Sequence, residues 1–456
     1  MDPLPTAVIR FLVLLPLTYP LYLSQRYWGG HGWRLAGRVP HRGLRLALRA
    51  ALLLAIAALV VPGFWWMIIG SRGLVLQSVP FAVSGLWLFT AFSSWCGIKL
   101  VHGIEQLWHW ARSRREVSSS GIGVGAGPAA AVPNPSRRYF FQTAGYVAGA
   151  APFVGSLYGF AVERLQYRVE RVEIPIRDLP AALDGLRIGQ LSDIHIGGYM
   201  SREQVRRAVE LANEMAPELF VVTGDFVTGR SDPLEDCIEE MARLRAPLGV
   251  WGCNGNHEIY AGAEDRAARL FQQGSMRMLR QQNAEIRWRG EKFNLLGVDH
   301  QITRGFGGHL QTHMLAGVET LVRSGMPNIL LSHNPNAFYR AAELGIDLTI
   351  AGHTHGGQIQ VEIIDSRLNP ARFMTEFIAG LFRRPVTGGE LATRHSLARR
   401  SLDAGGPLAT GSASSQAADG NPPFAHLYVN RGLGTVGTPV RIGSPPEITL
   451  LVLRRA

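Results

Sequence analysis

Residues 348–357 read LTIAGHTHGG, and this stretch decides how the second half of the chain is interpreted. Apolar side chains alternate along residues 344–350, a period-two pattern that is typical of a β-strand. Gly352 indicates a turn, so His353 and His355 are expected on a loop at the carboxyl end of that strand, where α/β sheets place their ligands. Neutral imidazole is the commonest protein metal ligand. Two loop histidines alone do not define a site, so their meaning depends on the other residues near them.

Four other apolar runs end in the same way. The segments LRIGQLSDIHIGG, ELFVVTGDFV, LGVWGCNGNHE and NILLSHNPN each pass from apolar residues into side chains that can bind a metal. These side chains are Asp193, His195, Asp225, Asn256, His257, Glu258 and His333. Helix-like stretches at 201–215, opened by Ser201, and at 233–245 lie between these runs. The alternation predicts an α/β domain in which five strand ends converge on one edge.

Each of these residues has an ordinary structural explanation when it is taken alone. Asp193 could cap a helix, Asp225 after a glycine could belong to a turn, and Asn256 is part of a common Gly-Asn turn pair. His257 and His333 could be hydrogen-bonded loop histidines. Five such coincidences at five strand ends are not plausible as turns, and the joint pattern indicates a metal centre.

The order of these motifs, DxH, GD, GNHE, H and GHTH, resembles that of the calcineurin-like metallophosphoesterase superfamily. The phrases LSDIHIG, VVTGDFV, GNHEIY, LLSHNP, IAGHTHGGQI and NRGLGTVGTPVRIGSPPEITLLVL are most similar to its bacterial branch of YkuE- and YaeI-like phosphoesterases. The resemblance covers about residues 167–385 and 424–454. It implies a four-layer α/β/β/α sandwich that hydrolyses phosphate esters with two divalent metal ions.

The resemblance also implies which residues hold each ion. The first ion is expected at Asp193, His195, Asp225 and His355. The second is expected at Asp225, Asn256, His333 and His353. Asp225 would therefore bridge the two ions, and the HxH pair would divide between them. The mixed oxygen and nitrogen ligands suit Mn, Fe or Zn.

Hydrolysis also needs a nucleophile and a proton donor. A metal-bridging hydroxide is the expected nucleophile. His257 faces the leaving group in the family, where it is expected to act as general acid or to stabilise developing charge, with Glu258 orienting it. Three other histidines match no family motif and are interpreted as structural or solvated: His300, His309 and His313.

The net positive charge of the chain lies almost entirely in its first third. The formal net charge is +11, and the first 163 residues hold 14 basic and 4 acidic residues against 32 and 31 in the rest. No nucleic-acid partner is expected for the main domain, since such a domain would carry its own positive charge. Nothing in the sequence identifies a protein partner.

Four apolar stretches in residues 1–165 predict transmembrane helices and therefore contact with a lipid bilayer. They lie at about 9–24, 50–70, 74–98 and 141–162. Eight of the ten tryptophans fall between Trp28 and Trp110, several near segment ends, as in interfacial aromatic belts. Buried core helices are the alternative, but the second and third stretches are uncharged over about twenty residues, the length that spans a bilayer.

Arginines in the loops predict the orientation. The loops after the first and third apolar stretches are arginine-rich, so both are expected in the cytoplasm. The fourth stretch then runs outward from an inner membrane, and the catalytic domain, residues 166–456, is expected to be extracytoplasmic. SRRYFFQ at 136–142 resembles a twin-arginine export signal, although ordinary positive-inside arginines explain it equally well. By composition, residues 117–136 read as a flexible linker and about 386–423 as a low-complexity insert.

Other features have two interpretations each. RFMTEFIAGLFRR at 372–384 has the pattern of an amphipathic basic helix, which could contact a membrane or an acyl chain, or could pack on the domain's own core. Arg431 lies in a glycine-rich stretch that could approach a phosphate or form a tight turn. Cys237 and Cys253 could form a bridge, but their spacing does not require one.

These observations favour a membrane-anchored, two-metal phosphoesterase for phosphodiester, pyrophosphate or phosphomonoester bonds, including envelope or lipid-linked substrates. Some relatives cleave a UDP-linked diacylglucosamine intermediate, a cytoplasmic compound that the expected topology disfavours. One alternative is a catalytically silent metal-binding sensor or scaffold, which the intact His257 argues against. The other is a channel or transporter with a regulatory domain, and the apolar stretches carry hardly any ionisable residue that such a path needs.

Overall fold

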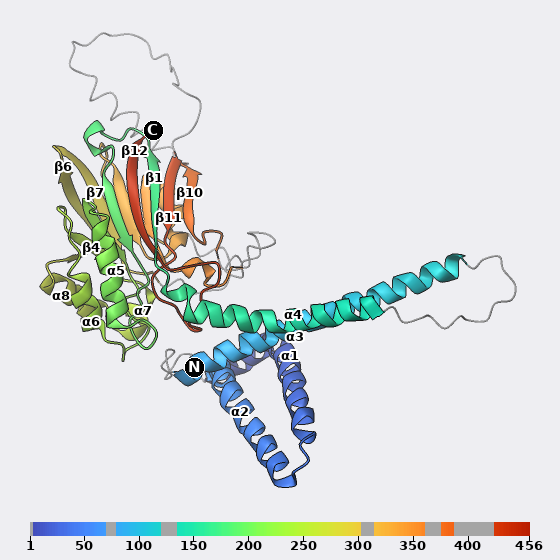
Figure 1. Ribbon diagram of the computed structural model, residues 1–456. Helices are drawn as coiled ribbons and strands as arrows, with labels where there is room; N and C mark the ends of the chain where they lie inside the picture. The colour runs from blue at the N-terminus through green and yellow to red at the C-terminus, as the bar shows by residue number, and fades with distance from the viewer. Residues whose placement is uncertain (1–2, 70–78, 120–134, 302–313, 361–374, 387–423) are drawn as a thin grey trace, which may run out of the picture. The chain divides into compact units, whose positions relative to one another are not determined.

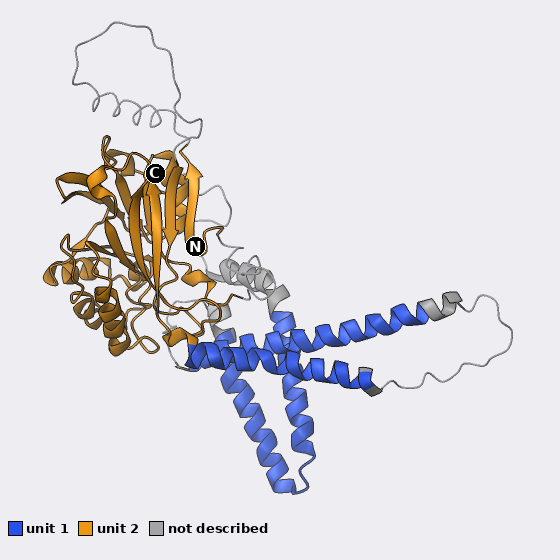
Figure 2. Ribbon diagram, turned by 45° about the horizontal axis from the view of Figure 1, so that its top comes forward, with its two compact units in different colours: residues 1–162 blue, residues 163–456 orange. Residues whose placement is uncertain are grey.

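The protein is described here by a computed structural model, which covers residues 3–69, 79–119, 135–301, 314–360, 375–386 and 424–456. The chain divides into two compact units, residues 1–162 and residues 163–456 (Figure 2). The expected linker falls mostly at 120–134 and the expected insert at 387–423, and both of these ranges lie outside the described residues.

The described part of the N-terminal unit consists of helices and short connections (Figure 1). Its helices are α1 (Pro3–Gly37), α2 (Arg42–Ile69), α3 (Val79–Ser119) and α4 (Pro135–Ala161). Three stretches of the described residues are long and apolar enough to cross a membrane, namely Arg42–Gly63, Pro80–Arg114 and Arg138–Leu165. They correspond to the second, third and fourth apolar stretches of the sequence. The first stretch, 9–24, lies within α1, where the side chains before residue 18 are outside the described residues.

Small polar side chains join the helices of this unit. Ser94 Oγ on α3 donates to the Gly149 carbonyl on α4 at 2.6 Å, and Thr90 Oγ1 donates to Ser156 Oγ at 3.0 Å. On α2, by contrast, Leu54 is 72% exposed. Polar groups inside and apolar groups outside are the arrangement expected for helices that pack in lipid, and the opposite of a water-soluble bundle.

The C-terminal unit is built on two six-stranded sheets. The first sheet has the order β1 (Arg168–Ile176), β12 (Glu447–Arg455), β2 (Arg187–Leu191), β3 (Leu219–Thr223), β4 (Val250–Cys253) and β5 (Arg277–Met278). The second has the order β10 (Gly380–Pro385), β11 (Phe424–Val429), β9 (Leu348–Ala351), β8 (Asn328–Ser332), β7 (Glu291–Val298) and β6 (Gln282–Trp288). The strands β2, β3 and β4 run parallel, and so do β7, β8, β9 and β11.

Helices cover the outer faces of both sheets, which gives four layers. Ile188 and Val221 of the first sheet share a core with Leu331 of the second, so the sheets pack face to face. The helices α5 (Arg202–Glu214), α6 (Leu234–Met241) and α8 (Glu264–Gln273) pack on the outer face of the first sheet (Figure 1). The short helix α9 (Phe338–Glu343) packs on the second sheet. This architecture confirms the predicted α/β/β/α sandwich.

The sequence explains these elements locally. All five residues of β3 are buried, as expected for a strand that is covered on both faces. Ser201 caps α5 through a capping box with Gln204, so the prediction of a helix opened by Ser201 is confirmed.

The predicted amphipathic helix at 372–384 is wrong for the residues described there. Residues 380–385 form β10, which pairs antiparallel with β11, and residues 375–379 are irregular. Phe377 is buried against Phe338 and Phe382, so it lies in the domain's own core, whereas Leu381 is 41% exposed. Burial alternates along β10 with a period of two, because pairing with β11 makes this part of the segment a strand.

The three cysteines of the chain are free thiols in the structure, so Cys237 and Cys253 form no bridge.

Candidate metal centre

The sequence-predicted residues lie at the carboxyl ends of strands from both sheets. Asp193 and His195 follow β2, Asp225 follows β3, and Asn256 opens the short helix α7 (Asn256–Ala261) after β4. His333 follows β8, and His353 and His355 follow β9. Since the sheets stack, these two sets of loops meet above the shared core. The expected convergence therefore spans the edges of two sheets rather than one.

Five of these residues have a left-handed backbone. The φ angles of Asp193, His195, Asp225, His353 and His355 lie between 48° and 76°. Such a conformation costs on the order of 1 kcal/mol or more for a residue with a Cβ, and it clusters at functional sites. The strain indicates that the fold positions these side chains for a purpose other than stability.

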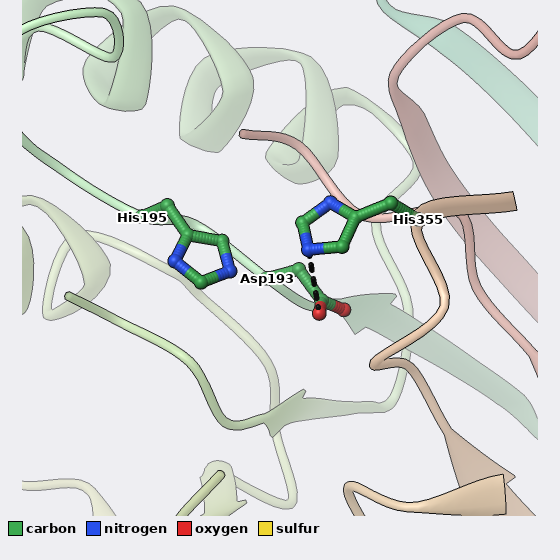
Figure 3. Close-up of side chains that lie close together, drawn as sticks. All are labelled: Asp193, His195 and His355. Carbon is green, nitrogen blue, oxygen red and sulfur yellow. Dashed lines mark ion pairs between the residues drawn. The ribbon is translucent and has the colours of Figure 1, made fainter. Parts of the chain in front are cut away.

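The first group consists of Asp193, His195 and His355, each of which offers a ligand atom within 4.8 Å of the others. Figure 3 shows the two imidazoles beside the Asp193 carboxylate, with His355 Nε2 at 3.4 Å from Asp193 Oδ1. The backbone N–H of His353 donates to both Asp193 oxygens at 3.0 and 3.1 Å, which fixes the carboxylate.

The second group consists of Asp225, His333 and His353, again within 4.8 Å of one another. His333 Nε2 lies 3.0 Å from Asp225 Oδ2 and 3.2 Å from His353 Nδ1. Asp225 Oδ2 is also 3.5 Å from His195 Nε2, so this one carboxylate stands between the two groups. A bridging role for Asp225 fits this position.

Hydrogen bonds behind the rings turn one nitrogen of His333 and one of His195 toward the centre. His333 Nδ1 bonds to the Thr223 carbonyl at 2.6 Å, and His195 Nδ1 bonds to Thr228 Oγ1 at 2.9 Å. A carbonyl partner requires the proton on His333 Nδ1, which makes Nε2 the nitrogen that can bind a metal.

Asn256 supplies an independent sign that the donor set fits cations. Its Oδ1 is buried and has no hydrogen-bond donor among the described residues. Buried side-chain oxygens almost always have a partner, so an unpartnered oxygen on this loop fits a position that accepts a cation. Amide oxygen, carboxylate and imidazole together suit Mn, Fe or Zn.

The electrostatics of the pocket favour positive charge next to its two carboxylates. Burial lowers the pKa of His195 to about 3, so it stays a neutral imidazole. Burial alone would raise the pKa of Asp225, but the charges of His333 and His257 outweigh it and hold that pKa well below its usual range. Burial would likewise lower the pKa of His333, but Asp225 and Asp193 raise it to about 10. The two carboxylates thus attract positive charge to this point.

Gly352 is required for close approach rather than for a turn with positive φ. A Cβ at this position would collide with Ser192 Oγ and Asp193 Oδ2. The absence of a side chain therefore lets the β9 loop of one sheet approach the β2 loop of the other.

Glu258 does not orient His257, contrary to the prediction. Its two oxygens accept from the backbone N–H groups of Asp225, Phe226 and Gly255 at 2.8 Å, and of Val227 at 3.3 Å. Glu258 thereby ties the β3 loop to the β4 loop. The Thr228 carbonyl orients His257 instead, at 2.9 Å from its Nδ1.

His257 forms a third such group with His195 and Asp225, whose ligand atoms also lie within 4.8 Å of one another. Its ring is 4.8 Å from that of His195 and 5.5 Å from that of Tyr260, measured between centroids, and its backbone N–H donates to Asp225 Oδ1 at 2.9 Å. The side chain is therefore at the edge of the centre, next to the residue between the two groups.

His300 also borders the centre, which the sequence interpretation missed. Its ring centroid is 5.7 Å from His353 and 6.3 Å from His333, and its backbone N–H donates to the Asn254 carbonyl at 3.2 Å. The segment FNLLGVDH was a further apolar run with a polar end, and it forms β7 beside β8, so the same pattern could have found it. His309 and His313 lie outside the described residues.

Arg431 has a structural role in its loop. Its Nη2 is 2.7 Å from Glu170 Oε1 and its Nε is 2.6 Å from Glu447 Oε2, so two carboxylates neutralise it. The turn interpretation of this loop is favoured over a phosphate contact.

Comparison with known proteins agrees with this arrangement. Residues 186–357 match the family described as Calcineurin-like phosphoesterase. A "Transmembrane protein with metallophosphoesterase domain" from Danio rerio is 28% identical over 310 residues, 66% of this chain and 60% of that protein. YkuE from Bacillus subtilis, an uncharacterized metallophosphoesterase, is 26% identical over 325 residues, 70% of this chain and 98% of its own length. The "UDP-2,3-diacylglucosamine pyrophosphatase LpxG" of Chlamydia trachomatis is 23% identical over 356 residues, 66% of this chain and 94% of its own length.

Proposed function

We propose that this chain, which carries a calcineurin-like metallophosphoesterase domain at residues 186–357, hydrolyses phosphate esters at a two-metal centre and is attached to a membrane by its N-terminal helices. One observation carries the proposal. Two groups of buried carboxylate and imidazole ligands meet at Asp225, whose Oδ2 lies 3.0 Å from His333 and 3.5 Å from His195.

Two divalent ions, Mn, Fe or Zn, would neutralise the charge of the transferring phosphoryl group and activate the attacking water. Asp193, His195 and His355 would hold one of them. Asn256, His333 and His353 would hold the other, with Asp225 shared.

His257 supports the reaction as proton donor to the leaving oxygen. With its Nδ1 bonded to the Thr228 carbonyl, the other ring nitrogen is the one that can carry a proton to the substrate. Its backbone bond to Asp225 ties its position to the metal centre.

The membrane helices suggest the class of substrate. A domain anchored at a bilayer meets envelope phosphodiesters and pyrophosphates, including lipid-linked ones, at high local concentration. The arginine-rich loops after the first and third apolar stretches support an extracytoplasmic position at an inner membrane. LpxG is named for a nucleotide-linked lipid substrate, and that position disfavours the same substrate here because it is cytoplasmic.

The full chain in detergent, stripped of metal and reloaded with Mn, tests the proposal on bis-p-nitrophenyl phosphate and p-nitrophenyl phosphate. We expect Mn to restore turnover and Asp225→Asn to reduce it at least a thousandfold with loss of bound Mn. His257→Ala should reduce turnover about a hundredfold with both ions retained. Binding of two Mn ions without turnover of either ester would favour the silent sensor instead.

A further inference from the structure

Arg441 is a buried arginine that contacts no carboxylate in the described part of the chain. Its side chain is 0% exposed. The guanidinium donates four hydrogen bonds of 2.6–3.0 Å, all to backbone carbonyls, those of Arg431, Gly432, Gly434 and Ser444. Among the described residues it has no ion pair. Burial of a guanidinium that has only carbonyl partners costs free energy of folding. A structural role in this part of the fold would explain why the residue is there.

The four carbonyls belong to one segment, residues 430–444, which connects β11 to β12 and which we name the clamp loop. At one end of the clamp loop, the N–H of Leu433 donates to the Ser192 carbonyl at 3.0 Å, and the N–H of Gly434 donates to the Asp193 carbonyl at 2.7 Å. At the other end, Ser444 Oγ donates to the His355 carbonyl at 3.0 Å. The clamp loop thus joins the β2 loop of one sheet to the β9 loop of the other.

The contact with the β2 loop is as close as backbone packing allows. A Cβ on Gly432 would lie 2.5 Å from Asp193 Cβ, and a Cβ on Gly434 would lie 2.9 Å from His195 Cβ. Real Cβ atoms do not approach so closely, so any displacement of the clamp loop would displace Asp193 and His195 with it.

These contacts reach the first group of ligands directly, whereas the second group is linked to the clamp loop only through neighbouring backbone, such as the bond from the Asn430 N–H to the Ala351 carbonyl at 2.9 Å. The clamp loop contacts Asp193, His195 and His355, the members of the first group. His333 and Asp225 are positioned by other partners, namely the Thr223 carbonyl and the loop that Glu258 ties down. Asp193 is also the acidic group that most stabilises the charge of Arg441 against the cost of burial.

We propose that Arg441 is a positioning residue that holds the clamp loop against Asp193, His195 and His355 and thereby sets the affinity of the first ion without binding it. The inference rests on the proposed two-metal function and adds that the affinity of only one of the two ions depends on Arg441. Loss of Arg441 should weaken the binding of the first ion selectively. The expected size is about 10–100-fold in affinity, as is typical when a residue that supports a metal ligand is replaced.

Manganese binding to the full chain in detergent tests this inference. Calorimetric titration gives the two affinities, and electron paramagnetic resonance separates a coupled pair of Mn ions from a single ion. For Arg441→Gln we expect one ion bound at least tenfold more weakly, the other within twofold of wild type, and a single-ion spectrum at limiting Mn. That spectrum should match His355→Ala and differ from His353→Ala. Arg441→Lys, which keeps the charge but reaches fewer carbonyls, should lower the affinity for the first ion about threefold.

Two further variants separate positioning from folding. Arg187→Gln removes a half-buried arginine paired with Glu218 at 2.7 Å, away from the centre, and should destabilise the fold without changing Mn binding. Ser444→Ala removes only the bond to the His355 carbonyl and should weaken the same ion about threefold, even if Arg441→Gln does not fold.

The outcomes distinguish this inference from the proposed function. If wild type binds fewer than two Mn ions, both are overturned. If wild type binds two and Arg441→Gln binds both with unchanged affinity, or loses both equally, only the role of Arg441 is overturned. Tighter binding by Arg441→Gln would also overturn it, because repulsion between Arg441 and the ion would then outweigh positioning.

Discussion

The two units of this chain both bury polar side chains, but two buried hydroxyls of the helical unit have hydrogen-bond partners, whereas a buried amide oxygen at the candidate metal centre of the sheet unit has none among the described residues. In the helical unit, Ser94 and Thr90 each have a hydrogen-bond partner on α4. In the described part of the sheet unit, Asn256 Oδ1 has no donor, and His333 Nε2 lies 3.2 Å from His353 Nδ1. Satisfied buried groups join helices, whereas buried groups left to face one another mark a place for a ligand.

Metal removal should give the largest difference between the units. Dialysis against a chelator should lower the rate of ester hydrolysis at least a thousandfold, because the proposed ions neutralise phosphoryl charge and activate water. The helical content measured by circular dichroism should stay unchanged, since the bonds of α3 and α4 involve no metal ligand. Mn should restore turnover, and hydrolysis that persists in the metal-free chain would contradict the proposed centre.

Glu258→Gln should produce the next largest effect. The amide would present a donor to backbone N–H groups that now donate to a carboxylate, which leaves buried donors unsatisfied at about 1–3 kcal/mol each. We expect a loss of about 3 kcal/mol in the free energy of unfolding and faster hydrogen exchange at Asp225 and Phe226. The exposed Glu173→Gln is the control, and equal effects of the two substitutions would contradict the structural role of Glu258.

Glu240 tests charge pairing away from the centre. Its carboxylate is buried, and hydrogen bonds from Arg206 and Arg202 lower its pKa to about 2. A lowered carboxylate pKa stabilises the fold above the unfolded value near 4.5, and this stability is lost as pH falls toward 2. Glu240→Gln should therefore lower the free energy of unfolding at pH 7, measured with urea, by about 1–2 kcal/mol. The effect is no larger because solvent screens the half-exposed arginine partners. The difference from wild type should disappear near pH 2, and a constant difference would contradict the ion pair.

Ser94→Ala should have the smallest effect. It removes the bond to the Gly149 carbonyl and should cost about 0.5–1 kcal/mol in thermal unfolding of the chain in detergent. Ser113→Ala, which removes an exposed bond within α3, should cost less. Neither substitution should change Mn content, and a change would show that the two units are coupled.

The candidate ligands could be found from the sequence because each follows an apolar run directly. A buried strand such as β3 has a continuous apolar sequence, and the chain must become polar where the strand reaches the edge of the sheet. That rule located Asp193, Asp225 and His333, and applied once more to β7 it would have located His300. It failed at 372–384, where apolar spacing suggested a helix and the partner strand β11 made part of the segment a strand.

The sequence by itself determined the α/β alternation, the apolar helices of the first unit and the identity of the candidate ligands, because these depend on residues that are near each other along the chain. The tertiary structure decided which atoms meet. Glu258 bonds to the loop of Asp225 rather than to His257, and Arg441 binds the carbonyls of the clamp loop that contacts Asp193. The Glu258 contact joins loops that follow two neighbouring strands of one sheet, β3 and β4, and the clamp loop reaches Asp193 because it leads into β12, the neighbour of β2.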